Sequence, residues 1–342
     1  MPLAVTVFSL FGNLYKTNTT KTNSHSYQLG DLDSRSLCYH RQRMSIKEYP
    51  PQKSLHVPVL LEPTLELLDP KKDESYLDLT AGYGGHASRV LEITGNYAES
   101  ILVDRDDYAI KRLKSFSDKG VRLLQTDFVT AARQLIKSGQ KFNMILIDLG
   151  VSSPQLDQFE RGFSFTNSGS LDMRMDRRQV KTAEMIVNTA SVDELTRIIN
   201  QYGEEPIGLS RTIASAIVAN RPLSQTGELA DLIKQNYRGK WKKIHPATRT
   251  FQALRIAVND ELRQINDLLP LLPELLKPGG RVGIISFHSL EDRLVKRYFK
   301  EQFDSGFEAE FTSLTKKPIA GSINDVHNPR ARSSKLRAAV KK

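Results

Sequence analysis

Short apolar runs that alternate with helix-like stretches constrain the fold more than any other feature of this chain. Helical spacing lies between several of the runs, for example at residues 86–93 and 108–116. Strand–helix–strand alternation predicts a parallel sheet covered by helices on both faces. We therefore predict an α/β fold with a doubly wound sheet. The expected buried strands are residues 76–80, 100–104, 121–127, 144–149 and 281–287.

A long stretch, residues 156–277, separates the fourth run from the fifth. Neighbouring strands of a doubly wound sheet need far fewer connecting residues, so we expect an inserted subdomain. Helical spacing recurs in this part of the chain, at residues 192–201, 210–220, 226–237 and 250–269. The last of these has an apolar stripe that predicts core packing, formed by Phe251, Leu254, Val258, Leu262, Ile265 and Leu269.

These patterns divide the chain into four parts. We predict a main domain in two parts, residues 44–156 and 251–342, and a mainly helical substrate-recognition insert at 157–250. Polar residues crowd the chain before Met44, a composition that buries little apolar surface. Residues 1–43 are therefore expected to be a disordered extension or a misassigned start, with Met44 as the physiological first residue.

Cysteine usage and hydropathy limit the class of protein. Cys38 is the only cysteine in the sequence, which excludes a disulfide framework and indicates a reducing, cytoplasmic location. No apolar run reaches the roughly 20 residues that span a bilayer, so we expect no membrane partner.

Positive charge is in excess, with 49 Lys and Arg against 39 Asp and Glu. Such a balance suits nucleic acid, an anionic membrane or solubility alone. Residues 234–249 contain several cations and no acid, interleaved with aromatic residues. Cations for phosphates and aromatic faces for unstacked bases are typical of single-stranded RNA recognition; a solvated helix end with a half-buried Trp is the alternative. A second basic cluster, the C-terminal cluster, is formed by Arg330, Arg332, Lys335, Arg337, Lys341 and Lys342. The RNA candidates from these two segments are Lys240, Trp241, Lys242, Lys243, Arg330 and Arg332.

A glycine-rich loop, AGYGGHA at residues 81–87, follows the first expected strand. Glycines let the backbone turn sharply near a ligand, and the next helix presents unpaired N–H groups. Asp104 ends the second strand twenty residues after Gly84, where a carboxylate accepts hydrogen bonds from ribose hydroxyls. The alternative is a tight turn without a ligand. The combination favours a nucleoside ligand, either a nicotinamide dinucleotide or S-adenosylmethionine.

Two features bear on that choice. Acids end later strands at Asp127 and Asp148, and Phe128 is either a cover for an adenine or a core aromatic. The turn LKPGGRV at residues 276–282 resembles the segment before the fifth strand of class I S-adenosylmethionine-dependent methyltransferases. This resemblance favours S-adenosylmethionine and a class I, Rossmann-like fold.

Longer motifs narrow the resemblance to one family. In order along the chain they are HVPVLLE at 56–62, GGH at 84–86, DLGVSSPQLD at 148–157, RGFSF at 161–165, LDMRMD at 171–176, FQALRIAVN at 251–259, SFHSLEDR at 286–293 and NPRARSSKLR at 328–337. Together they resemble the RsmH (MraW) family over about residues 55 to 337.

This resemblance implies an activity, a substrate and a cofactor site. The family methylates the exocyclic N4 of one cytidine in the decoding centre of 16S ribosomal RNA, so the implied partner is 16S rRNA, within the small ribosomal subunit. Tyr83 departs from the family, which more often has a small residue there. The implied S-adenosylmethionine-binding residues are Gly84, Gly85, His86, Asp104, Phe128, Asp148 and Gln155.

The chemistry suggests roles for a few side chains. Cytosine's exocyclic nitrogen is a weak nucleophile, so positioning and hydrogen-bond acceptors should supply most of the catalysis. We predict Asp148 as an acceptor near the target amine, the alternative being cofactor binding alone. His288 either contacts substrate or caps a turn, while Ser289 and Asp292 suggest a capping box.

The remaining polar clusters leave roles open. Arg161 and Phe163 are candidates for RNA contact, or for the core of the insert. Asp172 and Asp176 flank Arg174, which suggests that the three side chains brace one another, and their role stays open; we expect no metal site. Two other functions remain as alternatives: a nicotinamide oxidoreductase, and a non-catalytic RNA-binding ribosome assembly factor with a vestigial nucleoside pocket.

Overall fold

The computed structural model describes residues 58–238 and 244–342. Two expectations from the sequence lie outside these residues. One is the start at Met44, and the other is the central part of the first basic segment, formed by Lys240, Trp241, Lys242 and Lys243.

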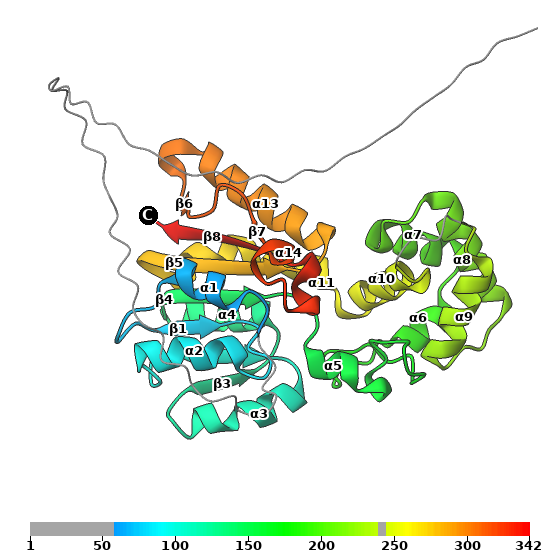
Figure 1. The fold of residues 1–342 in the computed structure, drawn as a ribbon, viewed down its shortest axis with the longest axis horizontal. Coiled ribbons are helices and arrows are strands. Elements are labelled where there is room, and N and C mark those ends of the chain that lie inside the picture. Colours follow the sequence, from blue (N-terminus) through cyan, green and yellow to red (C-terminus); the bar gives the residue numbers. More distant parts are fainter. Residues whose placement is uncertain (1–57, 239–243) are drawn as a thin grey trace, which may run out of the picture. The chain divides into compact units, whose positions relative to one another are not determined.

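The described residues form one eight-stranded sheet, in the order β3-β2-β1-β4-β5-β8-β6, with β7 paired to β8 (Figure 1). Strands β1 to β5 run parallel, whereas β8 is antiparallel to β5, β6 and β7. The strand order reverses between β1 and β4, the position where doubly wound sheets bind ligands. The strands are β1 (Tyr76–Asp78), β2 (Ile101–Asp104), β3 (Arg122–Gln125), β4 (Phe142–Asp148), β5 (Leu276–Ser286), β6 (Phe311–Ser313), β7 (Ile319–Ala320) and β8 (Lys335–Lys341).

Helices belong either to the sheet or to the insert (Figure 1). Those packed with the sheet are α1 (Leu61–Leu68), α2 (Gly85–Thr94), α3 (Asp107–Ser117), α4 (Phe128–Lys137), α11 (Glu261–Leu268), α12 (Leu272–Leu275) and α13 (Ser289–Asp304). The insert contains α6 (Ala183–Thr189), α7 (Val192–Gly203), α8 (Ile207–Ala219), α9 (Thr226–Asn236) and α10 (Ala247–Asn259). Shorter elements are α5 (Ser153–Asp157), α14 (Gly321–Asn324), and the 3-10 turns η1 (Phe159–Arg161), η2 (Leu269–Leu271), η3 (Gly306–Glu308) and η4 (Pro329–Ser333).

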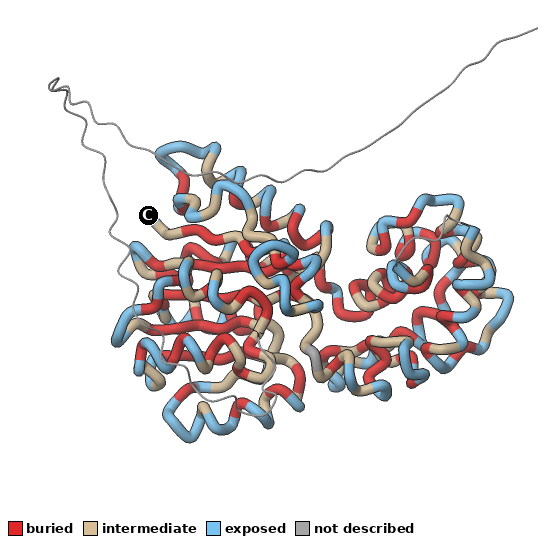
Figure 2. The backbone as a smooth tube through the Cα atoms, in the orientation of Figure 1, coloured by how far each residue is buried: buried red, intermediate tan, exposed pale blue. Residues whose placement is uncertain are grey.

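Two cores cover the two faces of the sheet, because side chains of a strand alternate between its faces. In β4, Met144 and Leu146 pack with α1, α2 and α3, whereas Ile145 and Ile147 pack with α4, α11, α12 and α13. The buried strands between these layers are plain in Figure 2. The apolar run in β4 is therefore continuous because both of its faces are covered.

The insert has a third core of its own, built by α6 to α10 and the segment before them. Its buried members extend along the chain from Phe163 to Val258. Since this core contains no residue of the sheet, the insert buries its apolar surface by itself. The insert and the sheet are then joined by polar contacts, described below.

Three expectations about single elements are corrected by the structure. Strand β3 was expected to be buried, but its residues are exposed or partly exposed, because β3 lies at the edge of the sheet. The helix expected at 250–269 is broken at Asp260, whose φ of 55° is left-handed. The basic C-terminal segment forms β8, which the sequence did not predict.

The break at Asp260 divides one apolar stripe between two cores. Phe251, Leu254 and Val258 pack in the insert, whereas Ile265 and Leu269 pack against the sheet. Core packing is thus confirmed for the stripe, but for two cores instead of one. In the part of the chain that the structure describes, no helix is long and apolar enough to cross a membrane.

Candidate active site at the carboxyl edge of the sheet

The glycine loop connects β1 to α2 at the point where the strand order reverses. Gly84 has a φ of 80°. A Cβ atom added at Gly84 would lie only 2.5 Å from the ring of Phe116. Both the left-handed backbone and this close approach require glycine here. Helix α2 begins without a side-chain cap and without an acid in its first turn. Its first N–H groups therefore offer a site for an anion.

Asp104, the last residue of β2, faces this loop. Its Oδ2 accepts a hydrogen bond from the Gly82 N–H at 2.8 Å, and its Oδ1 accepts one from the Asp106 N–H at 2.8 Å. Burial raises the pKa of Asp104 to about 6, against the lowering effect of these two hydrogen bonds. Each oxygen keeps a second lone pair. The carboxylate is thus oriented by the backbone and still able to accept from a ligand.

Asp148, the last residue of β4, is bonded differently. Its backbone N–H donates to Thr80 Oγ1 at 2.5 Å, but its carboxylate Oδ1 is buried without a hydrogen-bond partner. Burial raises the pKa of Asp148 well above its usual range, and the carboxylates of Asp78 and Glu291 add to this effect. A buried acceptor without a hydrogen-bond partner destabilises the fold by roughly 1–3 kcal/mol. Such groups are rare in proteins unless a ligand supplies the missing hydrogen bond.

His86 lies beside the second oxygen of Asp148. The His86 Nε2–H donates to the carbonyl of Val59 at 3.1 Å, so in the neutral ring Nδ1 has no proton. Burial lowers the pKa of His86 to about 4, which keeps the ring neutral near pH 7. Nδ1 lies 3.6 Å from Asp148 Oδ2, longer than a hydrogen bond. Oδ2 therefore receives no hydrogen bond from His86.

Of the other expected cofactor residues, Gly85 is the first residue of α2, and Phe128 and Gln155 are buried. Phe128 is the first residue of α4 and belongs to the sheet core, with 8% of its surface exposed. Gln155 is buried, and its amide is engaged: Nε2 donates to Asp106 Oδ2 at 2.7 Å, and Oε1 accepts from the Ser152 N–H. Gln155 is therefore placed to act on the loop after β2 through Asp106.

His288 caps helix α13, which begins beside the end of β4 because β5 pairs with β4. The capping box uses His288 and Glu291, one residue before the expected pair of Ser289 and Asp292. That expectation is wrong because Asp292 instead binds cations of β8, Lys335 and Arg337, at 2.8 Å each.

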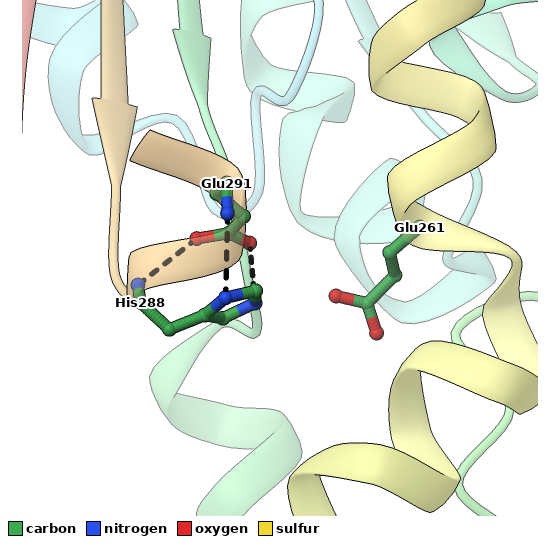
Figure 3. Close-up of side chains that lie close together, drawn as sticks. All are labelled: Glu261, His288 and Glu291. Atoms are coloured by element: carbon green, nitrogen blue, oxygen red, sulfur yellow. Dashed lines mark hydrogen bonds and ion pairs between the residues drawn. The ribbon is translucent and has the colours of Figure 1, made fainter. Parts of the chain in front are cut away.

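One group of described residues has donor atoms close enough for a metal ion: Glu261, His288 and Glu291, all within 4.8 Å of one another (Figure 3). The two carboxylates are engaged within the protein, whereas His288 Nε2 is buried without a hydrogen-bond partner. Arg255 donates to both oxygens of Glu261 at 2.9 Å, and the N–H groups of Phe287 and His288 donate to Glu291 Oε2.

His288 also contacts Glu291 at both ring nitrogens. Its Nδ1 accepts from the Glu291 N–H, and its Nε2 lies 3.2 Å from Glu291 Oε1. Burial raises the pKa of Glu291, but the hydrogen bond and charge of His288 and the charge of Arg255 outweigh it, and the net shift is downward. We interpret the cluster as a network of hydrogen bonds and charges at the start of α13.

The residues predicted to contact RNA differ in their exposure to solvent. Arg161 is 2% exposed and bound to Asp106, and Phe163 belongs to the insert core, so both have structural roles in place of RNA contact. Arg330 is partly exposed and paired with Asp157 at 3.1 Å, and Arg332 is exposed. Other cations of the C-terminal cluster are engaged in the fold, as Arg337 and Lys341 illustrate.

The structure adds residues that the sequence did not single out. Thr80, Asp106 and Glu291 complete the polar edge, and Ser286 Oγ, at the end of β5, is buried without a hydrogen-bond partner like Asp148 Oδ1. Asp106 follows Asp104 closely, and Ser286 lies one residue before the end of the predicted strand 281–287, so their positions were the available signal.

Comparison with known proteins shows which family this chain is similar to. The sequence profile of the MraW methylase family matches residues 53–342. A ribosomal RNA small subunit methyltransferase H from Synechocystis is 47% identical over 297 residues, covering 84% of this chain and 93% of that protein. The protein of the same name from Heliobacterium modesticaldum is 42% identical over 310 residues, covering 84% of this chain and 98% of that one.

Similarity to solved structures is weaker. An rRNA methylase from Streptococcus thermophilus has a TM-score of 0.39 and 9% sequence identity, covering 84% of this chain and 99% of that one. The sequence identities, together with the profile match over most of the chain, establish the relationship. This chain therefore belongs to the MraW methylase family.

Proposed function

We propose that this chain transfers a methyl group from S-adenosylmethionine to the exocyclic N4 of a cytidine in the decoding centre of 16S rRNA. Family membership supports the methyl transfer, and the names of the curated relatives support RNA of the small ribosomal subunit as substrate. The motif resemblance supports the choice of N4. The observation that carries the proposal is the buried, partnerless Oδ1 of Asp148 at the reversal of strand order.

The residues present fit S-adenosylmethionine. Asp104 keeps one lone pair on each oxygen for the two ribose hydroxyls, and the uncapped start of α2 at Gly84 suits the methionine carboxylate. Phe128 lies beyond the end of β3, where a ring can cover the adenine. A nicotinamide oxidoreductase is not retained, because the family is one of methylases.

The chain's own groups then activate the acceptor. When bound, S-adenosylmethionine supplies a methyl group already activated by its positive sulfur. Asp148 Oδ1 accepts an N–H of the cytosine amine, which orients the nitrogen and raises its electron density. A raised pKa also makes the Asp148 carboxylate a stronger base for the proton that N4 loses on methylation.

RNA must reach this edge with its base unstacked. We assign the approach to two cations on η4, the partly exposed Arg330 and the exposed Arg332, to the basic stretch at 240–243 and to His288 beside the end of β4. Phosphate contacts of this kind release counterions, so RNA affinity should fall steeply with salt. An RNA affinity that does not depend on salt would contradict this assignment.

The test is nucleoside analysis of the product. Purified protein, S-adenosylmethionine and small ribosomal subunits from cells that lack the gene are incubated, and the 16S rRNA is digested and analysed by mass spectrometry. We expect N4-methylcytidine to appear at one site and to be absent without the donor. Methylation of another atom would overturn the N4 assignment. RNA binding without methylation would favour the non-catalytic assembly factor.

A further inference from the structure

A buried ion pair connects the insert with the loop after β2, which carries Asp104 and Asp106. Arg161 Nη1 donates to Asp106 Oδ2 at 2.9 Å, and both side chains are 2% exposed. Arg161 lies in η1, at the entry to the insert, and Asp106 lies in the loop after β2. A buried guanidinium with a carboxylate partner is expensive to desolvate, so such a pair is retained where its geometry has a use.

Asp106 connects this pair to the carboxylate that we assign to the ribose. Its backbone N–H donates to Asp104 Oδ1 at 2.8 Å, and its own Oδ1 accepts from the Tyr108 N–H at 3.0 Å, which caps α3. The remaining oxygen, Oδ2, accepts from Arg161 and from Gln155. Among the described residues, the hydrogen bonds that orient the Asp106 carboxylate thus come from its own helix or from the segment leading into the insert.

Arg161 is itself held from the far side. Its Nη2 donates to the carbonyls of Arg174 and Met175, and its own carbonyl accepts from the Met173 N–H at 3.0 Å. The guanidinium also lies over the ring of Tyr108 at 5.6 Å. Arg161 therefore joins two stretches of the insert segment to the loop that carries Asp104.

We infer that Arg161 is a positioning residue for the methyl donor, acting through Asp106 on the ribose-binding carboxylate of Asp104. The inference rests on the proposed function, because it takes Asp104 as a donor contact. It makes the affinity for the donor depend on the insert, whose core residue Met175 also contacts the loop after β2 by accepting a hydrogen bond from Arg105 at 2.9 Å. Gln155 supports the same oxygen of Asp106 and acts in the same direction.

The test compares three variants: Arg161→Met, Asp106→Asn, and both together. Affinity for S-adenosylhomocysteine is measured by calorimetry, folding by thermal unfolding, and kcat at saturating donor by methylation. We expect Arg161→Met to raise the Kd about tenfold or more, equivalent to about 1.4 kcal/mol, with kcat changed less than about threefold. Arg174→Met is the matched control, because Arg174 pairs with Asp172 on the same segment and does not touch Asp106.

The double variant separates positioning from stability. Removing both charges leaves no unpaired buried ion, so the unfolding temperature should recover toward that of the unaltered protein while the Kd stays high. Recovery of the Kd together with the unfolding temperature, or an unchanged Kd in a folded Arg161→Met protein, would overturn the inference. If Arg161→Met does not fold, the double variant and Arg161→Lys provide the same comparison.

Failure of the proposed function gives a different result. If the chain does not use S-adenosylmethionine, the unaltered protein binds no S-adenosylhomocysteine, whereas failure of this inference leaves that binding intact and insensitive to Arg161. Failure of the N4 assignment alone is detected by nucleoside analysis of the product and leaves the effect of Arg161→Met on the Kd unchanged.

Discussion

Two carboxylates lie at the same edge of the sheet, Asp104 at the end of β2 and Asp148 at the end of β4, yet their surroundings differ. At the end of β2, both oxygens of Asp104 accept backbone N–H groups from the two loops beside it. At the end of β4, Asp148 has one oxygen buried without a partner and another facing an unprotonated nitrogen of His86. Each oxygen of Asp104 therefore has a hydrogen-bond partner before any ligand arrives, whereas Asp148 Oδ1 has none.

The difference suggests a division of labour. A carboxylate oriented by the backbone suits the binding of a donor that has the same shape throughout the reaction. An incomplete acceptor suits a group that arrives only with the second substrate, because its missing hydrogen bond is then formed at the reacting nitrogen. The predictions below test whether the two strand ends have these separate roles.

The largest effect is expected at the end of β4. Asp148→Asn keeps the size of the side chain but removes its negative charge, and we expect kcat to fall about 100-fold, by analogy with loss of one oriented group in other active sites. The Kd for S-adenosylhomocysteine should change less than about threefold. Single-turnover methylation and calorimetry measure the two quantities.

Asp193→Asn is the control for that variant, because Asp193 is an exposed carboxylate paired with Arg211 in the insert. Equal losses of turnover and donor affinity in Asp148→Asn would show that the two strand ends share one role.

The end of β2 should show the opposite pattern. Asp104→Asn places an amide against one of the two backbone N–H groups and removes the charge that accepts ribose hydroxyls. We expect the donor Kd to rise about 30-fold, equivalent to about 2 kcal/mol, with kcat at saturating donor within about threefold. Asp118→Asn, an exposed position after α3, is the control. A fall in kcat without a change in Kd would reverse the comparison.

Donor affinity should also depend on pH through Asp104. Its pKa is about 6, and the ionised form binds the hydroxyls, so affinity is full above pH 6 and is lost as the pH falls through this value. At pH 5 the Kd should be about tenfold weaker than at pH 8. Calorimetry over this range measures the profile. Asp104→Asn has no carboxyl group to titrate there, so a sloping profile in that variant would assign the dependence to another group.

The smallest effect is expected at the end of β5, where Glu261, His288 and Glu291 gather. Because Arg255 and backbone N–H groups already occupy the carboxylates, removal of divalent cations with EDTA should leave the unfolding temperature and the donor Kd unchanged. Thermal unfolding and calorimetry of the protein without RNA check this. A decrease in unfolding temperature that added Zn²⁺ reverses would identify a metal site after all.

Local patterns were sufficient to find most strand ends of the site. Gly84, Asp104 and Asp148 follow or end runs of apolar residues, and parallel strands bring such positions to one edge. The periodicity of residues 250–269 also identified buried positions correctly. It did not show the break at Asp260, since a single left-handed residue leaves the apolar spacing on either side intact.

Other roles depended on contacts between distant parts of the chain. Arg161 looked like a candidate for RNA contact because its neighbours are aromatic, but it is paired with Asp106, 55 residues away. The same holds for Asp292, which looked like part of a helix cap and instead binds Arg337 of β8. Charged side chains have the same appearance in a sequence whether a partner or solvent surrounds them.

The amino-acid sequence alone determined the layered α/β architecture, the helical insert, the glycine loop and the family, because these depend on short-range periodicity and on motifs that stay together along the chain. The tertiary structure decided which buried polar groups have all of their atoms hydrogen-bonded within the protein. Asp104 and Asp148 have the same carboxylate and similar positions at strand ends, but only Asp104 has a backbone N–H group on each oxygen, one from its own loop and one from Gly82 in the glycine loop. Hydrogen-bond completion depends on distances of a few tenths of an ångström between segments far apart in sequence, and no local pattern encodes those distances.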